Sequence, residues 1–127
     1  MLNILLVGTG GFIGSVCRYL FGRSVHALFE RYYPWFPYGT LAVNITGCLI
    51  IGFLAGLSEY RHLFTNEARL FLFAGFLGGF TTFSSFGYET FVLARDVQPS
   101  AALVNVMLQL GIGLGAVWAG NALSRLI

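Results

Sequence analysis

Residues 75–86 read GFLGGFTTFSSF, and this stretch decides how the chain can fold. Two adjacent glycines precede four hydroxyl-bearing residues in five positions, and these residue types are poor helix formers. The stretch nevertheless lies inside a long apolar segment, residues 70–94, whose only charged residue is Glu89. Within lipid, a non-helical backbone is tolerated only where its polar groups find partners or line a cavity. We therefore predict a transmembrane helix that is broken by the segment from Gly78 to Phe86, which holds an ion site.

The composition of the whole chain indicates a membrane protein. Of its 127 residues, 57% are hydrophobic and 9% are charged, whereas a soluble domain carries about 25% charged residues. A bilayer core needs about 20 apolar residues in a helix, and four segments reach that length: residues 2–21, 38–57, 70–94 and 101–123. We predict an all-α membrane protein with four transmembrane helices, which form one domain over residues 1–127. No signal peptide is expected.

The arginines predict an unusual membrane topology. With four spans, both chain ends and the second loop lie on one side of the membrane, which then carries three arginines. The other side also carries three, and the chain has no lysine. Because an excess of Lys and Arg orients helices in the bilayer, a chain without that excess is expected to insert in both orientations. We therefore predict an antiparallel, dual-topology homodimer with a twofold axis in the membrane plane.

The glycines predict close helix packing. The chain has 17 of them, and small residues four apart let helix backbones approach closely within lipid. We expect most of these glycines to serve packing alone. The pairs with this spacing are Gly10 and Gly14, Gly52 and Gly56, Gly75 and Gly79, and Gly111 and Gly115.

Polar side chains within the spans are mostly hydrogen-bond donors, with Glu89 as the only acid. Polar groups in a bilayer are costly and often mark function, and a donor-rich interior favours an anion over a cation. The donors are Arg18, Thr40, Asn44, Thr46, Thr81, Thr82, Ser84, Ser85, Asn105 and Gln109.

Some of these donors have simpler interpretations. Asn44, and the Asn105 and Gln109 pair one turn apart, could each make only interhelical hydrogen bonds. Arg18 could extend to the membrane surface, or it could be a fixed positive charge that draws anions into a vestibule.

A break at Gly78-Gly79 also predicts a cation site. The freed carbonyl oxygens would point away from the helix axis, a twofold axis would double their number, and carbonyl oxygens bind hard cations. The side chains of Thr82, Ser85 and Glu89 follow along one helical face, at spacings of three and four.

The phenylalanines of the third span fall into two groups. Phe73, Phe76 and Phe80 recur at helical spacing and are interpreted as a packing stripe. Phe83 and Phe86 are flanked by hydroxyl residues instead. Because an aromatic ring has a positive edge, these two rings could attract an anion weakly.

Three motifs resemble the Fluc, or CrcB, family of fluoride channels. They are residues 11–19 (GFIGSVCRY), 39–47 (GTLAVNITG) and 78–86 (GGFTTFSSF) followed by Glu89. The resemblance implies a channel domain that exports fluoride passively from a prokaryotic cell and so reduces fluoride toxicity. It also implies a multi-pass protein of the plasma (inner) membrane, an antiparallel homodimer with two pores, and a structural sodium ion at the dimer centre.

The resemblance also implies roles for individual residues. The backbone carbonyls of Gly78 and Thr81 would hold sodium, the ring edges of Phe83 and Phe86 would contact fluoride, and Asn44 would donate to the ion. Arg18 would stabilise the vestibule, and Glu89 would be a pore-associated carboxylate. Further candidates for the polar path are Thr40, Thr82, Ser84, Ser85, Asn105 and Gln109.

Two other functions compete with the channel. A proton-coupled multidrug exporter of the four-helix, dual-topology type would need an acid deep in the membrane, and the first span has none. An assembly subunit without transport activity would leave the donor-rich third span without a purpose. We expect no enzyme activity, because His26 and His62 lie in separate loops without ligand neighbours. Lipid is the expected surrounding, and no nucleic-acid binding is expected.

Overall fold

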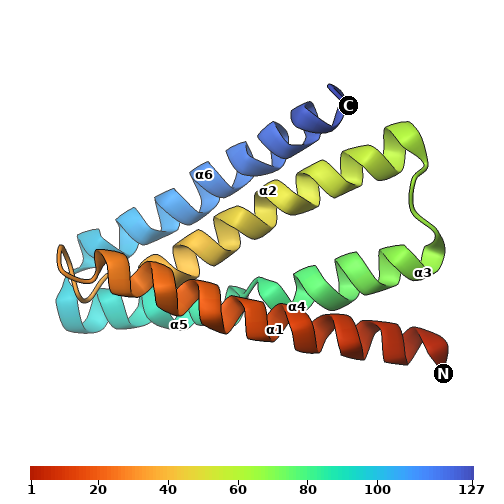
Figure 1. The fold of residues 1–127 in the computed structure, drawn as a ribbon. Helices are drawn as coiled ribbons and strands as arrows, with labels where there is room; N and C mark the ends of the chain where they lie inside the picture. The colour runs from red at the N-terminus through yellow and green to blue at the C-terminus, as the bar shows by residue number, and fades with distance from the viewer.

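A computed structural model describes all 127 residues and contains four helical segments long and apolar enough to cross a membrane. The prediction of a four-helix, multi-pass membrane protein is therefore confirmed. The first two are α1 (Leu2–Phe29) and α2 (Tyr38–Arg61), and the fourth is α6 (Pro99–Ser124). Both termini lie at one end of the molecule, beside the connection between α2 and α3 (Figure 1).

The third segment consists of several pieces. Its first half contains a wide π-helical stretch, η1, and its second half ends in another, η2. The pieces are α3 (Asn66–Arg69), η1 (Leu70–Leu77), α4 (Gly78–Phe80), α5 (Phe83–Val92) and η2 (Leu93–Val97).

The backbone between α4 and α5 is extended at two threonines. Thr81 has φ −82° and ψ 161°, and Thr82 has φ −151° and ψ 114°, values that suit β-branched residues. Gly78 is helical, with φ −62° and ψ −35°. The non-helical residues lie within the predicted segment, residues 78–86, but they follow Gly78-Gly79, where the freed carbonyls were expected.

Gly79 serves close packing instead. A Cβ atom on Gly79 would lie 2.9 Å from the Cα of Gly11 and would also clash with the carbonyl of Gly11. Gly14 meets η1 and α4 in the same way, since its Cβ would clash with the carbonyl of Phe76. These contacts join α1 to the first half of the third segment, and the two run side by side (Figure 1).

A second helix pair, α2 and α6, is also joined through glycines. A Cβ on Gly52 would clash with Val117, and one on Gly120 would clash with Leu49. In contrast, nothing lies within 4 Å of a Cβ on Gly111 or Gly115. The close packing predicted for Gly111 and Gly115 is therefore not made within the chain. The two helix pairs diverge toward the end that holds the termini (Figure 1).

Candidate ion site at the extended threonines

Asn44 on α2 pairs with the extended backbone of Thr82. Its Oδ1 accepts from the Thr82 N–H over 2.9 Å, and its Nδ2 donates to the Thr82 carbonyl over 3.1 Å. In a continuous α-helix the same N–H would donate to Gly78. The side chain of Asn44 thus replaces the backbone partner that Thr82 would have in a helix. Asn44 can reach Thr82 because α2 contacts α4 and α5.

The amide of Asn44 has no hydrogen left for a further ligand. An amide nitrogen carries two hydrogens, and the second is donated to Oε1 of Gln109 on α6 over 3.1 Å. Gln109 has 9% of its surface exposed, and its Nε2 is buried without a partner. The unused donor in this group therefore belongs to Gln109 and not to Asn44.

Three hydroxyls gather at the start of α5. Thr82 caps this helix, because its Oγ1 accepts from the N–H of Ser85 over 3.2 Å. The same oxygen lies 3.0 Å from Ser85 Oγ and 3.3 Å from Ser84 Oγ. Hydroxyl residues disfavour helix interiors but favour this capping position, which explains how the threonine-serine run both ends one helix and begins the next.

Phe83 and Phe86 form a ring pair on the first turn of α5. The ring centroids are 5.6 Å apart and the rings meet edge to face, at 62°. Phe83 has 81% of its surface exposed, whereas Phe86 is half-buried. Phe83 also lines a cavity of about 350 Å³ together with Asn44, Gly78 and Thr81.

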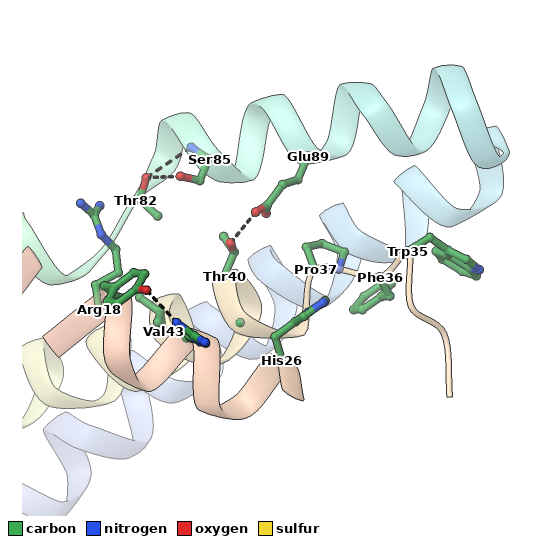
Figure 2. A pocket seen from close by; sticks show the side chains of 14 residues that line it. Arg18, His26, Trp35, Phe36, Pro37, Thr40, Val43, Thr82, Ser85 and Glu89 are labelled. Carbon is green, nitrogen blue, oxygen red and sulfur yellow. Dashed lines mark hydrogen bonds between the residues drawn. The ribbon is translucent and has the colours of Figure 1, made fainter. Parts of the chain in front are cut away.

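A second cavity of about 530 Å³ opens between α1, α2 and α5 (Figure 2). Its lining includes Arg18, Arg23 and His26 from α1, and its one acid is Glu89. Thr40 Oγ1 donates to Glu89 Oε1 over 2.7 Å, and Glu89 Oε2 is buried without a partner. The two arginines outnumber the acid, so the cavity favours anions. The vestibule interpretation of Arg18 stays a prediction.

Thr82 lines both cavities, so the capped start of α5 lies between them. On the α1 side, Arg18 Nη1 donates to the Thr81 carbonyl and Ser15 Oγ donates to the Gly79 carbonyl, each over 3.4 Å. Ser15 was not among the candidates, although it lies three residues before Arg18 and so on the same face of α1.

Asn105 on α6 has a partner that the sequence did not suggest. Its Nδ2 donates to Thr90 Oγ1 over 2.9 Å, and Thr90 in turn donates to the Phe86 carbonyl over 2.7 Å. Asn105 and Gln109 thus point to different groups, although they lie one turn apart on the same helix. The sequence signal for Thr90 is its position four residues after Phe86, where a threonine hydroxyl can donate to the carbonyl one turn earlier.

Known proteins are similar to this chain over almost its whole length. The family described as CrcB-like protein, Camphor Resistance (CrcB), matches residues 5–121. The chain belongs to the CrcB-like family. Its CrcB relatives include proteins named fluoride-specific ion channel FluC from Rhizobium meliloti (strain 1021), 44% identical, and Geobacter sulfurreducens, 43% identical. Each alignment covers 98% of this chain and 98% of the relative. A FluC protein of Clostridium novyi (strain NT) is 41% identical over 100% of this chain and 97% of its own.

The three CrcB-like motifs meet around the extended threonines. Residues 11–19 supply Ser15 and Arg18 from α1, and residues 39–47 supply Thr40 and Asn44 from α2. These side chains donate hydrogen bonds to residues 78–86 or to Glu89. The CrcB resemblance seen in the sequence is confirmed by the family match over residues 5–121.

Proposed function

We propose that this chain forms a fluoride-selective channel through which fluoride leaves the cell passively. The relatives named above are fluoride-specific ion channels and align with almost the whole chain. One observation carries the proposal for this chain itself. The buried Gln109 amide, with a hydrogen to donate and no partner, belongs to the hydrogen-bonded group around Thr82, which lies between two cavities.

The chemistry of this group suits fluoride. Fluoride is small and strongly hydrated, so a path through the membrane must replace its water with other donors and still release the ion. The Gln109 amide and the hydroxyls of Thr82, Ser84 and Ser85 supply donors. The ring edges of Phe83 and Phe86 supply weaker contacts.

The remaining residues support this path. Asn44 holds the extended backbone in place, since its own hydrogens are already used. Arg18 draws anions into the larger cavity, and the Thr40 hydroxyl orients Glu89 there.

Two antiparallel copies complete the site in this proposal. The supporting observation is the exposure of Phe83 and Gly78 in the single chain, because a ring exposed at 81% cannot enclose an ion. The equal distribution of arginines supports insertion in both orientations. The proposed location is the inner membrane. There the membrane potential, negative inside, drives an anion outward.

A structural sodium ion between the two copies fits the backbone of this segment. The Gly78 carbonyl has lost its usual helical donor, because the Thr82 N–H donates to Asn44. Gly78 is exposed, and both Gly78 and Thr81 line the smaller cavity. No cluster of His, Cys, Asp or Glu could hold a metal, so the ligands would be backbone carbonyls, two from each copy. Sodium would neutralise oxygen dipoles at the centre of the pair.

The alternative of a proton-coupled multidrug exporter has less support. It would carry cations past Arg18 and Arg23, which line the cavity that contains Glu89. The CrcB-like relatives named above carry the name of a fluoride channel and not of an exporter.

Fluoride efflux from liposomes tests the proposed function. We expect purified protein to release entrapped fluoride rapidly, as measured with a fluoride electrode, and to leave entrapped chloride in place. Phe83→Ile should reduce fluoride efflux, because it removes an aromatic ring edge. Phe12→Ile is the matched control, since Phe12 is an exposed ring on α1. Absence of fluoride efflux, or equal release of chloride, would refute the channel.

A further inference from the structure

Asn105 lies where α6 contacts α5, in surroundings unlike those of an ion ligand. Its side chain is fully buried, with 0% of its surface exposed. Its hydrogen bond to Thr90 Oγ1, 2.9 Å long, is the one side-chain hydrogen bond between α5 and α6.

The hydrogen bonds around Thr90 run in one direction. A hydroxyl has a single hydrogen, and Thr90 gives it to the Phe86 carbonyl, 2.7 Å away. The Thr90 oxygen can then only accept from Asn105. The amide, the hydroxyl and the Phe86 carbonyl form a directed chain in which each bond polarises the next.

α5 has few other anchors. None of its residues is buried. The segment that follows it, η2, is held by Leu93, which clusters with Ala101 and Ala102 at the start of α6. Asn105 lies one turn after Ala101 on the same face of α6. It therefore extends this anchoring along α5 toward Phe86.

The unpaired oxygen of Asn105 makes a packing role insufficient. Asn105 Oδ1 is buried without a partner, and burying a polar group without a hydrogen bond is unfavourable. A leucine would fill a similar space without that penalty. The amide is therefore explained by the bond that it donates.

We propose that Asn105 is a positioning residue and not an ion ligand. Through Thr90 it holds the backbone at Phe86 and so sets the geometry of the Phe83–Phe86 ring pair. This inference rests on the proposed function, in which that ring pair contacts fluoride. It replaces the expectation from sequence that Asn105 lines the fluoride path.

The test removes each end of the hydrogen bond separately. Asn105→Leu and Thr90→Val abolish the bond with little change of volume, whereas Thr90→Ser retains the hydroxyl. Thr9→Val is the matched control, because Thr9 on α1 also bonds the carbonyl four residues earlier, at 2.7 Å, but is exposed. Fluoride efflux is measured in liposomes, and 4-fluorophenylalanine at Phe86 reports the ring environment by 19F NMR.

We expect Asn105→Leu to slow fluoride efflux by roughly threefold to twentyfold, the range of interhelical hydrogen bonds in membranes. Thr90→Val should slow efflux at least as much, because it also removes the bond to the Phe86 carbonyl. The double variant should be no slower than Thr90→Val alone, because Thr90→Val already removes the bond that Asn105→Leu breaks. Both should shift the 19F signal of Phe86, whereas Thr90→Ser and Thr9→Val should leave signal and efflux unchanged.

Loss of efflux in Asn105→Leu, with wild-type efflux and 19F signal in Thr90→Val, would overturn the inference, since Asn105 would then act without Thr90. If Asn105→Leu does not fold, an unchanged 19F signal in Thr90→Val is sufficient to overturn it. The 19F signal does not depend on transport. Absence of efflux from the wild-type protein would therefore refute the proposed function. The 19F signals of Asn105→Leu and Thr90→Val would still decide whether Asn105 positions Phe86.

Discussion

At the scale of single residues, two amides divide the work that sequence reasoning had assigned to one. Asn44 gives both of its amide hydrogens away, to Thr82 and to Gln109. The Gln109 carbonyl accepts one of them, which leaves the Gln109 nitrogen as the free donor. Asn44 thus orients Gln109, and Gln109 is the better candidate for direct contact with the ion.

Replacement of the Gln109 amide by a carboxylate tests this division. In Gln109→Glu, one oxygen can still accept from Asn44, but the free donor becomes a negatively charged acceptor. We expect fluoride efflux to fall by about tenfold to a hundredfold, the range for loss of a hydrogen bond to a charged group. The measurement is liposome efflux with a fluoride electrode. Gln98→Glu is the control, since Gln98 is exposed before α6. Equal efflux from Gln109→Glu and wild type would exclude Gln109 as a donor to the ion.

At the scale of elements, the third segment is defined by its extended pair of threonines. The preceding helix ends where the Thr81 N–H donates to Leu77 over 3.0 Å. The next begins where Thr82 accepts from Ser85. The backbone carbonyls of these two threonines accept hydrogen bonds from side chains of α1 and α2. Such partners are the condition under which non-helical backbone is tolerated at membrane depth.

Loss of the Thr82 cap should weaken the start of α5. An N-cap contributes about 1 kcal/mol, so Thr82→Val should lower the free energy of unfolding by about that amount. It should also speed amide hydrogen exchange over the first turn of α5. Thr65→Val is the matched control, because Thr65 caps α3 by accepting from the N–H of Ala68 over 3.2 Å.

The two cap variants should differ in transport. Thr65 lies outside the proposed ion path, so Thr65→Val should loosen α3 without slowing fluoride efflux. Thr82→Val should both loosen α5 and slow efflux. If the two variants transport fluoride equally well, the cap at Thr82 has only a structural role.

The contact between α1 and the third segment should tolerate no added methyl group at Gly14. A Cβ there would lie 2.9 Å from the Phe80 nitrogen and would also clash with the Phe76 carbonyl. We expect Gly14→Ala to reduce stability by about 1–3 kcal/mol, as overpacking does. Thermal unfolding in detergent, followed by circular dichroism, measures this loss.

Gly8 on the same helix provides the comparison for Gly14. Nothing lies within 4 Å of a Cβ at Gly8. Alanine is the better helix former by about 1 kcal/mol. Gly8→Ala should therefore be neutral or slightly stabilising. Equal melting temperatures for Gly8→Ala and Gly14→Ala would show that the close approach of α1 is not rigid.

At the scale of the whole molecule, the single chain looks like part of a larger unit. Only 21 of its 127 residues are buried, and large apolar side chains cover its surface. Lipid accounts for much of that surface. It does not account for the exposed Phe83 beside the polar Thr82 group, which a second antiparallel copy would cover.

The proposed dual topology can be measured by cysteine labelling. Cys17 and Cys48 are free thiols within the spans and would first be changed to serine. Ser100→Cys then places one exposed thiol outside the membrane, at the start of α6. An impermeant maleimide should label about half of the chains in intact cells and all after permeabilisation, because no charge bias orients them.

A deliberate charge bias serves as the control for dual topology. Leu126→Lys with Ile127→Lys adds two positive charges on the side of the termini. We expect this variant to adopt mainly one orientation and to lose fluoride efflux, since antiparallel pairs could no longer form. Labelling of the parent chain from one side only would contradict dual topology.

The fold was largely predictable because lipid imposes simple requirements. Apolar length alone located four helices, and small residues four apart predicted close packing at Gly10, Gly14, Gly75 and Gly79. The structure shows that these glycines bring α1 against the third segment. The non-helical residues lie within the predicted segment, residues 78–86, but at the threonines and not at the paired glycines. Glycine weakens helices and also permits close contacts, and the local sequence cannot distinguish these uses.

The sequence by itself determined the number of spans, the family and the set of polar residues near the third segment. These depend on composition and on short motifs, which are local. Only the tertiary structure decided that Thr81 and Thr82 are the extended residues, that Gln109 keeps the free donor and that Asn105 donates to Thr90 on α5. The partners of Asn44 lie 38 and 65 positions along the chain. Which atoms of an amide remain free is therefore set by neighbours that only the packing of three helices brings together.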